Sequence, residues 1–222
     1  MRPPMKRLTL FCALSLAIVL QASASLSTNF SASTGAVFAN SGSVPDNNFS
    51  GWSDTRNLNV TEYVGFTVTD VQVTLDISGG WNGDLYGYLV HDSGFVVLLD
   101  RVGNSTYSPY GYGNAGFTGV TLADDVSHTS IESYGGTSGA SAALSGGTYN
   151  SQDGTLNTAF DGLSVNGNWT LFLADLSSGD ISQVTGWTLT IEAVPEPTTY
   201  ALMLVGAAFG GWRLAQRRTK SC

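Results

Sequence analysis

Hydrophobic and polar residues alternate along several short stretches in the middle of the chain. In the clearest of them, residues 71–77, aliphatic side chains occupy the odd positions and polar side chains the even ones. A period of two residues is that of a β-strand with one face buried. Residues 84–90 follow a similar pattern, and a tight turn at 91–94 leads into the apolar residues 95–99, which predict a central strand covered on both faces.

The second half of the body contains fewer patterns of this kind. Residues 169–174 and 187–191 both alternate, and we expect them to form a terminal hairpin around the loop 175–180. Between positions 104 and 147, Gly, Ser, Tyr and Thr predominate, which predicts long loops around a single strand at 117–122. Because the body lacks the 3.6-residue period of a helix, it is predicted to be an all-β, antiparallel sandwich or barrel.

The N-terminal residues have the pattern of a secretory signal peptide. Three basic residues within positions 2–7 precede an apolar core at 8–20, and small residues at 22–24 provide a cleavage site. We therefore expect residues 1–24 to be removed on export. The two cysteines, Cys12 and Cys222, lie in the two ends, so the exported body has neither a disulfide nor a thiolate metal site.

The C-terminal residues 194–222 begin with two prolines flanking a glutamate. Because proline fixes φ and lacks a backbone donor, we expect the last strand to stop before the motif and an exposed spacer to begin there. The apolar run at 200–212 is at the short end of what crosses a bilayer as a helix, and the basic cluster after it would stay on the cytoplasmic side. The motif is Pro195, Glu196 and Pro197, and the basic cluster is Arg213, Arg217 and Arg218.

This order of motif, apolar helix and basic cluster resembles the PEP-CTERM sorting signal of Gram-negative bacteria. The resemblance implies that an exosortase in the inner membrane recognises the Pro-Glu-Pro motif and removes the transmembrane sorting helix. The protein would then be exported, anchored transiently in the inner membrane, and sorted to the cell surface or the extracellular polysaccharide matrix. A single-pass anchor that is never processed is the alternative.

Charge separates the body from the two ends. Residues 25–194 contain sixteen acids against two basic residues, Arg56 and Arg101, which gives a net charge of −14. Phosphate binding needs clustered Lys or Arg, so nucleic acid and anionic lipid are disfavoured as partners. Such an acidic surface is typical of a protein that is soluble outside the cell or that binds calcium.

Several short motifs occur in order along the body. They are Val44-Pro45-Asp46-Asn47, the strand 71–77, Gly83-Asp84-Leu85, the turn 91–94 and Gly167-Asn168-Trp169-Thr170-Leu171. Together they resemble the P domain, or P/Homo B domain, of subtilisin-like proprotein convertases. The resemblance implies a jelly-roll-like antiparallel β-sandwich of about eight strands over residues 37–193, preceded by an N-terminal segment at 25–36. In convertases this domain does no chemistry and supports the protease on which it packs.

Two groups of residues are candidates for ligand binding. Calcium prefers oxygen ligands from carboxylates, amides and loop carbonyls, and several acids flank the predicted strands. Tyrosines in a Gly-rich loop form a candidate platform for polysaccharide. The candidate calcium ligands are Asp76, Asp84, Asp92, Asp175 and Asp180, and the candidate platform is Tyr107, Tyr110 and Tyr112.

A serine nucleophile is the remaining candidate chemistry. Residues 136–141 imitate the catalytic serine motif of subtilisin-like proteases, and Ser138 would need a histidine base that a carboxylate orients. His128 with Asp124 or Asp125 is the candidate pair, but His128 lies in a predicted loop, outside the sequence context of that protease family. We therefore predict that the protein is not an enzyme.

Three functions follow from these patterns. The leading hypothesis is an exported, non-catalytic β-sandwich module that binds a protein or a glycan outside the cell. The second is an accessory P domain that supports a separately encoded serine protease, and the third is a hydrolase. The expected partners are exosortase and the export machinery, with an extracellular polysaccharide or a protease as the ligand.

Overall fold

The computed structural model describes residues 23–31, 36–137, 139–152 and 154–196. The predicted signal peptide, apart from its last two residues, falls outside these ranges, as do Pro197, the apolar run 200–212 and the basic cluster. Within the described ranges, no helix is long and apolar enough to cross a membrane.

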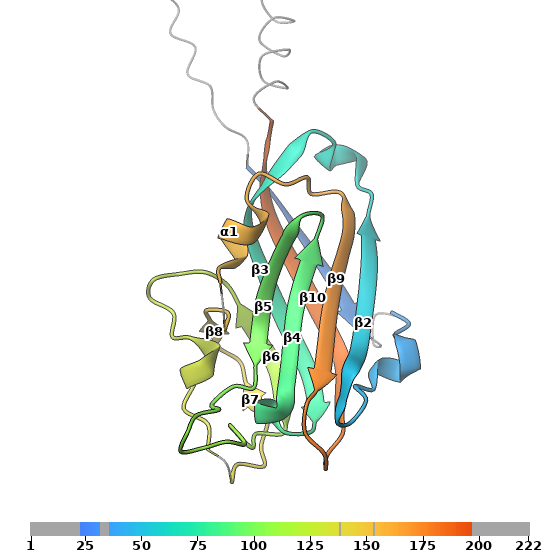
Figure 1. Ribbon diagram of the computed structural model, residues 1–222. Coiled ribbons are helices and arrows are strands. Elements are labelled where there is room, and N and C mark those ends of the chain that lie inside the picture. The colour runs from blue at the N-terminus through green and yellow to red at the C-terminus, as the bar shows by residue number, and fades with distance from the viewer. Residues whose placement is uncertain (1–22, 32–35, 138, 153, 197–222) are drawn as a thin grey trace, which may run out of the picture.

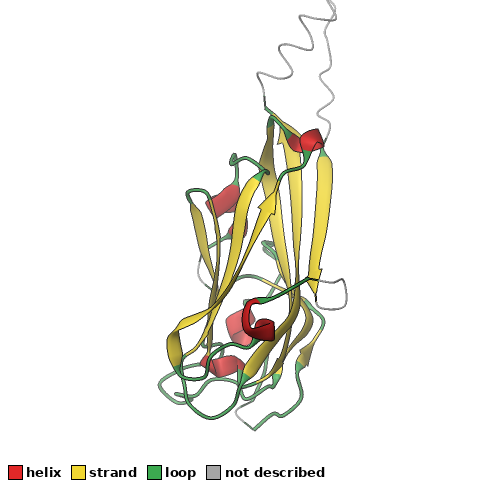
Figure 2. Ribbon diagram, turned by 90° about the vertical axis from the view of Figure 1, so that its right-hand side faces the viewer, coloured by secondary structure: helices red, strands yellow, loops and turns green. Residues whose placement is uncertain are grey.

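Two β-sheets pack face to face, which confirms the predicted all-β sandwich (Figures 1 and 2). The larger sheet has six strands, in the order β1-β10-β3-β6-β7, with β8 also paired to β6. Its pairs are antiparallel except for β7 and β8, which run parallel to β6. Its strands are β1 (Ala24–Ser31), β3 (Phe66–Gly79), β6 (Gly116–Leu122), β7 (Leu144–Ser145), β8 (Thr148–Tyr149) and β10 (Ser182–Pro195).

The smaller sheet has four antiparallel strands in the order β2-β9-β4-β5. They are β2 (Asn48–Leu58), β4 (Leu85–His91), β5 (Gly94–Asp100) and β9 (Gly167–Asp175). Across both sheets, eight described strands have seven or more residues, which agrees with the predicted number. The predicted strand at 117–122 corresponds to β6, and the predicted turn at 91–94 joins β4 to β5.

Short helices fill the gaps between strands. The single α-helix of the described residues, α1 (Leu156–Phe160), begins where the Thr155 hydroxyl accepts a hydrogen bond from Thr158 N. It buries Leu156 and Phe160 against β3 and β5. Four 3₁₀ turns complete the described elements: η2 (Ala39–Gly42), η3 (Thr61–Tyr63), η4 (Asn82–Asp84) and η5 (Ile131–Ser133).

The core lies between the sheets, as the alternating pattern predicts. In β3 the aliphatic side chains at positions 71, 73, 75 and 77 are all buried, and the polar side chains between them are half-buried. Trp169 of β9 and Trp187 of β10 are the largest fully buried side chains, one from each sheet. Burial of apolar area at about 25 cal/mol per Å² makes such side chains the main source of stability.

The predicted terminal hairpin of residues 169–174 and 187–191 is wrong. These residues lie in β9 and β10, which belong to different sheets, so the loop between them crosses from one layer of the sandwich to the other. Instead, β9 lies between β2 and β4, and β10 lies between β1 and β3. An alternating sequence indicates only that a strand has one buried face. Two strands in facing sheets show this pattern just as two strands of a hairpin do.

The prediction of a central strand at 95–99 is also wrong. β5 is at the edge of its sheet, and Phe95 is 52% exposed. Its apolar composition has another cause. Val96, Leu98 and Leu99 are buried in the core, while α1 and the segment at Gln152, whose N–H donates to Leu98 O, cover the strand from the side. Covering an edge in this way protects it from pairing with another chain.

The two ends of the sandwich differ in what they carry. At one end Ala24 lies opposite Ala193, and Pro195 lies opposite Phe66. At the other end Ser182 pairs with Gly79, and the β9–β10 loop meets the start of β4. Because β10 has fourteen residues, these ends are about 40 Å apart along the strand.

The expectation that the last strand stops before the Pro-Glu-Pro motif is wrong by one residue. Pro195 is the final residue of β10 and is buried, and Glu196 N–H donates to Gly65 O at 2.7 Å. Proline is tolerated here because it stands at the end of a strand, where the ladder does not need its missing N–H.

Candidate ligand-binding site

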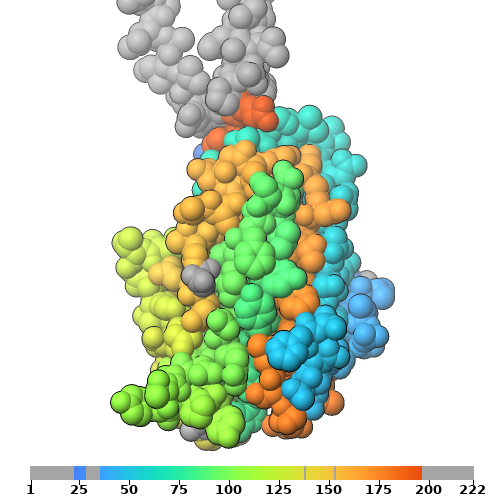
Figure 3. Space-filling view, viewed as in Figure 1, coloured from blue at the N-terminus to red at the C-terminus, as the bar shows by residue number. Residues whose placement is uncertain are grey.

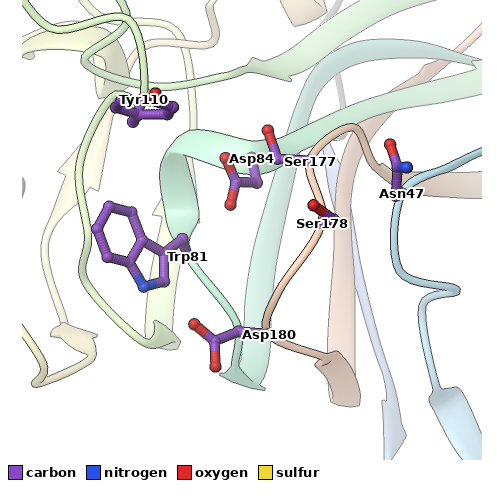
Figure 4. Close-up of a pocket in the computed structure, with 7 residues that line it drawn as sticks. All are labelled: Asn47, Trp81, Asp84, Tyr110, Ser177, Ser178 and Asp180. Carbon is purple, nitrogen blue, oxygen red and sulfur yellow. The ribbon is translucent and has the colours of Figure 1, made fainter.

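A cavity of about 570 Å³ opens at the end of the sandwich opposite Pro195 (Figure 4). Three separate segments contribute to it: the β3–β4 connection, the β5–β6 loop and the β9–β10 loop, together with the residue before β2. Figure 4 shows Trp81 and Tyr110 on one side, Ser177, Ser178 and Asn47 on the other, and Asp84 between them. The lining residues are Asn47, Trp81, Asp84, Tyr110, Ser177, Ser178 and Asp180.

Asn82 fixes the side of the cavity that carries Trp81 and Asp84. Its amide is buried and makes three hydrogen bonds: it donates to Gly116 O (3.0 Å) and to the Tyr134 hydroxyl (3.2 Å), and it accepts from Gly116 N (2.9 Å). A buried amide that is fully bonded in this way holds η4 rigidly against the β5–β6 loop.

Gly83 allows the close contact between η4 and the loop that contains Tyr110. A Cβ atom at this position would meet Tyr110 O at 2.2 Å and Gly111 Cα at 2.7 Å. The backbone N–H of Gly83 donates to Tyr112 O at 2.8 Å. Only glycine fits where two backbones approach so closely.

Two carboxylates and one backbone carbonyl hold the β9–β10 loop over the cavity. Asp175 Oδ1 accepts a hydrogen bond from Ser177 N at 3.2 Å, and Asp46 accepts one from Gly179 N at 3.2 Å. Leu176 N donates to Asp84 O at 2.9 Å. These bonds set the positions of the hydroxyl groups and of Asp180 at the cavity wall.

Arg101, one of the two basic residues of the body, lies beside this acidic end. It has φ +56°, and its guanidinium donates to Gly83 O at 3.3 Å, to Pro109 O at 3.2 Å and to the Ser177 hydroxyl at 3.5 Å. The Arg101 guanidinium therefore connects the three loops that surround the cavity.

Four acids make this end strongly electronegative. Burial, together with the charges of Asp84, Asp46 and Asp180, raises the pKa of Asp175 to about 6, against the hydrogen bond from Ser177 N. Burial also raises the pKa of Asp84, opposed by Ser177 and Arg101. The Oδ1 atom of Asp84 is buried and accepts no hydrogen bond in the described structure. The fold therefore disfavours the ionised form of both carboxyl groups.

The chemistry of the lining suits a neutral molecule rich in hydroxyl groups. Trp81 and Tyr110 offer apolar ring surface with a polar edge, while Asp84, Asp180 and Asn47 offer acceptors. Carboxylates form the stronger, charge-assisted hydrogen bonds with hydroxyl donors. An anionic ligand would be repelled by the same groups.

The structure brings together three of the five candidate calcium ligands and separates the other two. Asp84, Asp175 and Asp180 are near one another, joined by Asp46, which the sequence analysis treated only as part of a motif. Asp92 lies at the opposite end of β4, and Asp76 accepts a hydrogen bond from Gly119 N on the outer face of β3. Among the described residues, no group of three or more His, Cys, Asp or Glu side chains is arranged to hold a metal ion.

The three tyrosines of the candidate platform do not form one surface. Tyr110 is 66% exposed and lines the cavity, whereas Tyr107 is 98% exposed and lies outside the lining. Tyr112 packs edge-on against Tyr134, with ring centroids 4.6 Å apart, and contacts the core. Trp81, an aromatic residue of the β3–β4 connection, is the one that joins Tyr110 at the cavity.

The described members of the candidate triad bond to other groups. His128 Nδ1 lies 3.2 Å from Ala123 O. Asp124 accepts a hydrogen bond from Asn157 N at 2.7 Å, and Asp125 accepts from the N–H and hydroxyl of Ser127. Ser138 lies outside the described residues. A carboxylate–histidine bond, which orients the base in a serine triad, is not formed among the described side chains.

A second surface feature is an aromatic patch on the outer face of the four-stranded sheet, the face turned to the viewer in Figure 3. Tyr88 stacks on Phe172 with centroids 4.5 Å apart and contacts Phe95 at 5.1 Å. Phe49, which is 78% exposed, lines the same hollow with Tyr86. We call Phe49, Tyr86, Tyr88, Phe95 and Phe172 the aromatic patch.

Comparison with known proteins gives a family match at one end of the chain and several similar solved structures. The PEP-CTERM protein-sorting motif matches residues 193–218. No curated protein matches the chain. Among solved structures, the serine protease of Aeromonas sobria is similar, alone (TM-score 0.43, 15% identity) and in complex with its chaperone (TM-score 0.44, 16% identity). Each comparison covers 78% of this chain and 27% of the other chain, so this protein spans about a quarter of its neighbour's length.

The family match agrees with the sequence pattern of the C-terminal end. The motif implies export, anchoring of the C-terminal end in the membrane before cleavage, and processing by an exosortase. The chain is thus a β-sandwich protein that carries a PEP-CTERM protein-sorting motif at residues 193–218.

Proposed function

We propose that this protein is a non-catalytic binding module, displayed at the cell surface or in the extracellular polysaccharide matrix, whose cavity binds a neutral glycan. One observation carries the proposal: Trp81 and Tyr110 line a cavity together with the half-buried carboxylate of Asp84 and the exposed carboxylate of Asp180, in a strongly acidic protein. Aromatic side chains with a few convergent polar groups are the usual composition of a small-molecule site.

The position of the cavity supports display while the chain is still anchored. Pro195 and Ala24 lie at one end of the sandwich, and the cavity lies at the other. The ligand site therefore points away from the end that leads to the membrane. It is accessible both before and after the C-terminal tail is removed.

Binding can be tested by affinity electrophoresis of the full chain, purified in mild detergent, through gels containing neutral or acidic polysaccharides. We expect retardation by a neutral polysaccharide and none by an acidic one. Trp81→Ala should abolish retardation, whereas Tyr107→Ala, which removes an exposed tyrosine outside the cavity, should leave it unchanged. Equal retardation of both variants would overturn the proposal, and release of shortened glycan by the wild-type protein would identify a hydrolase instead.

A protein partner is the second candidate, and the aromatic patch favours it. Five aromatic side chains from all four strands of the smaller sheet make an apolar surface on an otherwise acidic protein. Exposed apolar patches of this kind typically mark protein interfaces, and an accessory role beside a separately encoded protease would use one. Cross-linking that is lost in Phe49→Ser, but retained in Trp81→Ala, would favour this second function.

A further inference from the structure

The sorting motif begins inside the folded sheet. Pro195, its first residue, is buried at the end of β10 opposite Phe66, and the N–H of Glu196 donates to Gly65 O at 2.7 Å. Val194 is paired with Thr67, whose hydroxyl lies 3.5 Å from Val194 O. The fold therefore engages two of the three motif residues.

The segment that carries the motif is held from one side. β1 begins at Ala24, opposite Ala193, so among the described strands Val194 and Pro195 pair with β3 alone. Between Glu192 and Ala193 the register of β10 on β3 shifts, which marks a bulge. A bulge interrupts the ladder and bends the strand, so it separates the last few residues from the rest of β10.

These two features make residues 193–196 a terminal unit that can open while the rest of the sandwich stays folded. Three residue pairs with β3, the pair of Ala193 with Ala24, and the hydrogen bonds from the Thr67 hydroxyl and from Glu196 N–H hold the unit, and Pro195 cannot donate to the ladder. Strand ends with few pairs are the parts of a protein that open at the lowest free energy.

One common mode of peptide recognition is strand addition, in which the recognised peptide is extended and its backbone groups bond to the partner. Here the backbone of Glu196 is already bonded and the side of Pro195 is covered. We propose that exosortase recognises the motif only after residues 193–196 have separated from β3, so that the sandwich itself limits the rate of sorting.

The proposal predicts how the rate depends on the distance between the motif and the fold. Processing should be proportional to the fraction of molecules in which the segment is open. Minor conformations of this kind are populated at roughly 0.1–10%. A Gly/Ser linker inserted between Val194 and Pro195 places the motif outside the sheet, and it should raise the initial rate of processing by about tenfold or more.

A reversible cross-link provides the complementary test. The full chain with Thr67→Cys and Val194→Cys, in a Cys12→Ser and Cys222→Ser background, is incubated with membranes that contain exosortase, and processing is followed by the mass of the product. The oxidised protein should not be processed, and addition of a reductant should restore the rate. The matched control, Ser27→Cys with Thr190→Cys, joins β1 to β10 on the other side of the bulge and should be processed whether oxidised or reduced.

The two experiments decide the proposal together. If the oxidised Thr67–Val194 variant is processed at the rate of the control, or if the linker leaves the rate unchanged, then opening of the segment does not limit sorting and the proposal is wrong. Neither result depends on the ligand of the cavity, because no glycan is present in either experiment.

Discussion

The indole N–H of Trp187 donates a hydrogen bond to Asp54 Oδ2 at 2.8 Å across the sandwich. Trp187 belongs to the six-stranded sheet and Asp54 to the four-stranded sheet, and both side chains are buried. The same carboxylate oxygen accepts from Arg56 Nε at 2.7 Å. One carboxylate thus links the two layers and is itself neutralised by one of the two basic residues of the body.

Replacing this carboxylate should be among the most destabilising polar substitutions. Asp54→Ala removes the acceptor of both the indole and the guanidinium, and we expect a loss of about 2–4 kcal/mol in the free energy of unfolding. Trp187→Phe keeps an aromatic ring and the Asp54–Arg56 pair, so it should lower the free energy of unfolding by less than Asp54→Ala does. Urea denaturation measures both, and a loss of less than about 1 kcal/mol for Asp54→Ala would contradict the role of this bond.

The acidic end predicts an inverse dependence of stability on pH. Asp175 has a folded pKa of about 6, above the ordinary value of about 3.9, so the fold favours its protonated form. Its contribution to stability is complete below about pH 4 and is lost as the pH rises through 6. Asp175→Asn mimics the protonated group and can keep the bond from Ser177 N. It should raise the free energy of unfolding at pH 7.5 by up to about 3 kcal/mol, with little gain at pH 4.

The control for this experiment removes a charge elsewhere. Asp161→Asn replaces an exposed carboxylate after α1 and should change stability little at pH 7.5. If Asp175→Asn gives no more stabilisation at pH 7.5 than at pH 4, the burial of Asp175 does not oppose its ionisation.

The close contact at Gly83 gives a third prediction. A methyl group there would collide with Tyr110 O and Gly111 Cα, so Gly83→Ala must displace the loop that forms one wall of the cavity. We expect a loss of about 1–3 kcal/mol in stability, together with weaker glycan binding. Gly139→Ala is the matched control because no heavy atom lies within 4 Å of the added carbon. Thermal unfolding of the two variants compares them directly, and equal melting temperatures would mean that the loop moves aside without cost.

The cavity itself gives a fourth prediction. Asp84→Asn keeps the shape of the side chain but replaces a charged acceptor of the cavity lining with a neutral amide. The affinity of the Asp84→Asn variant for a neutral glycan should be roughly three- to tenfold lower than that of the wild type, because a neutral hydrogen bond replaces a charged one. Titration calorimetry with the polysaccharide that retards the wild-type protein measures this. An unchanged affinity would show that Asp84 does not contact the ligand.

Sequence patterns predicted which faces are buried far better than which strands are neighbours. The alternation at 71–77 fixed the inward side chains of β3, but 169–174 and 187–191 were assigned to one hairpin although they lie in opposite sheets. A strand with one buried face has the same pattern in either arrangement, and the decisive contact, Trp187 with Asp54, joins positions 133 residues apart.

The sequence predicted only part of the candidate site, again because contacts between distant segments cannot be read from local patterns. Asp84, Asp175, Asp180 and Tyr110 were identified from residue type, yet Asp46 and Trp81 join them only through the packing of loops that are distant in sequence. Tyr112, a candidate on composition, instead packs edge-on against Tyr134 beside the core. Residue type indicates which side chains can bind a ligand, whereas loop packing decides which of them meet.

The pairing of β1 with β10 has a consequence for the order of events during export. Ser27 and Thr190 lie opposite each other although 163 residues separate them, so the first strand to cross the membrane has no partner until the last one has followed. Contacts of such long sequence separation form late in folding. The six-stranded sheet therefore cannot be completed until β10 has followed β1. The strand that completes the sheet is also the one that leads into the sorting motif at Pro195.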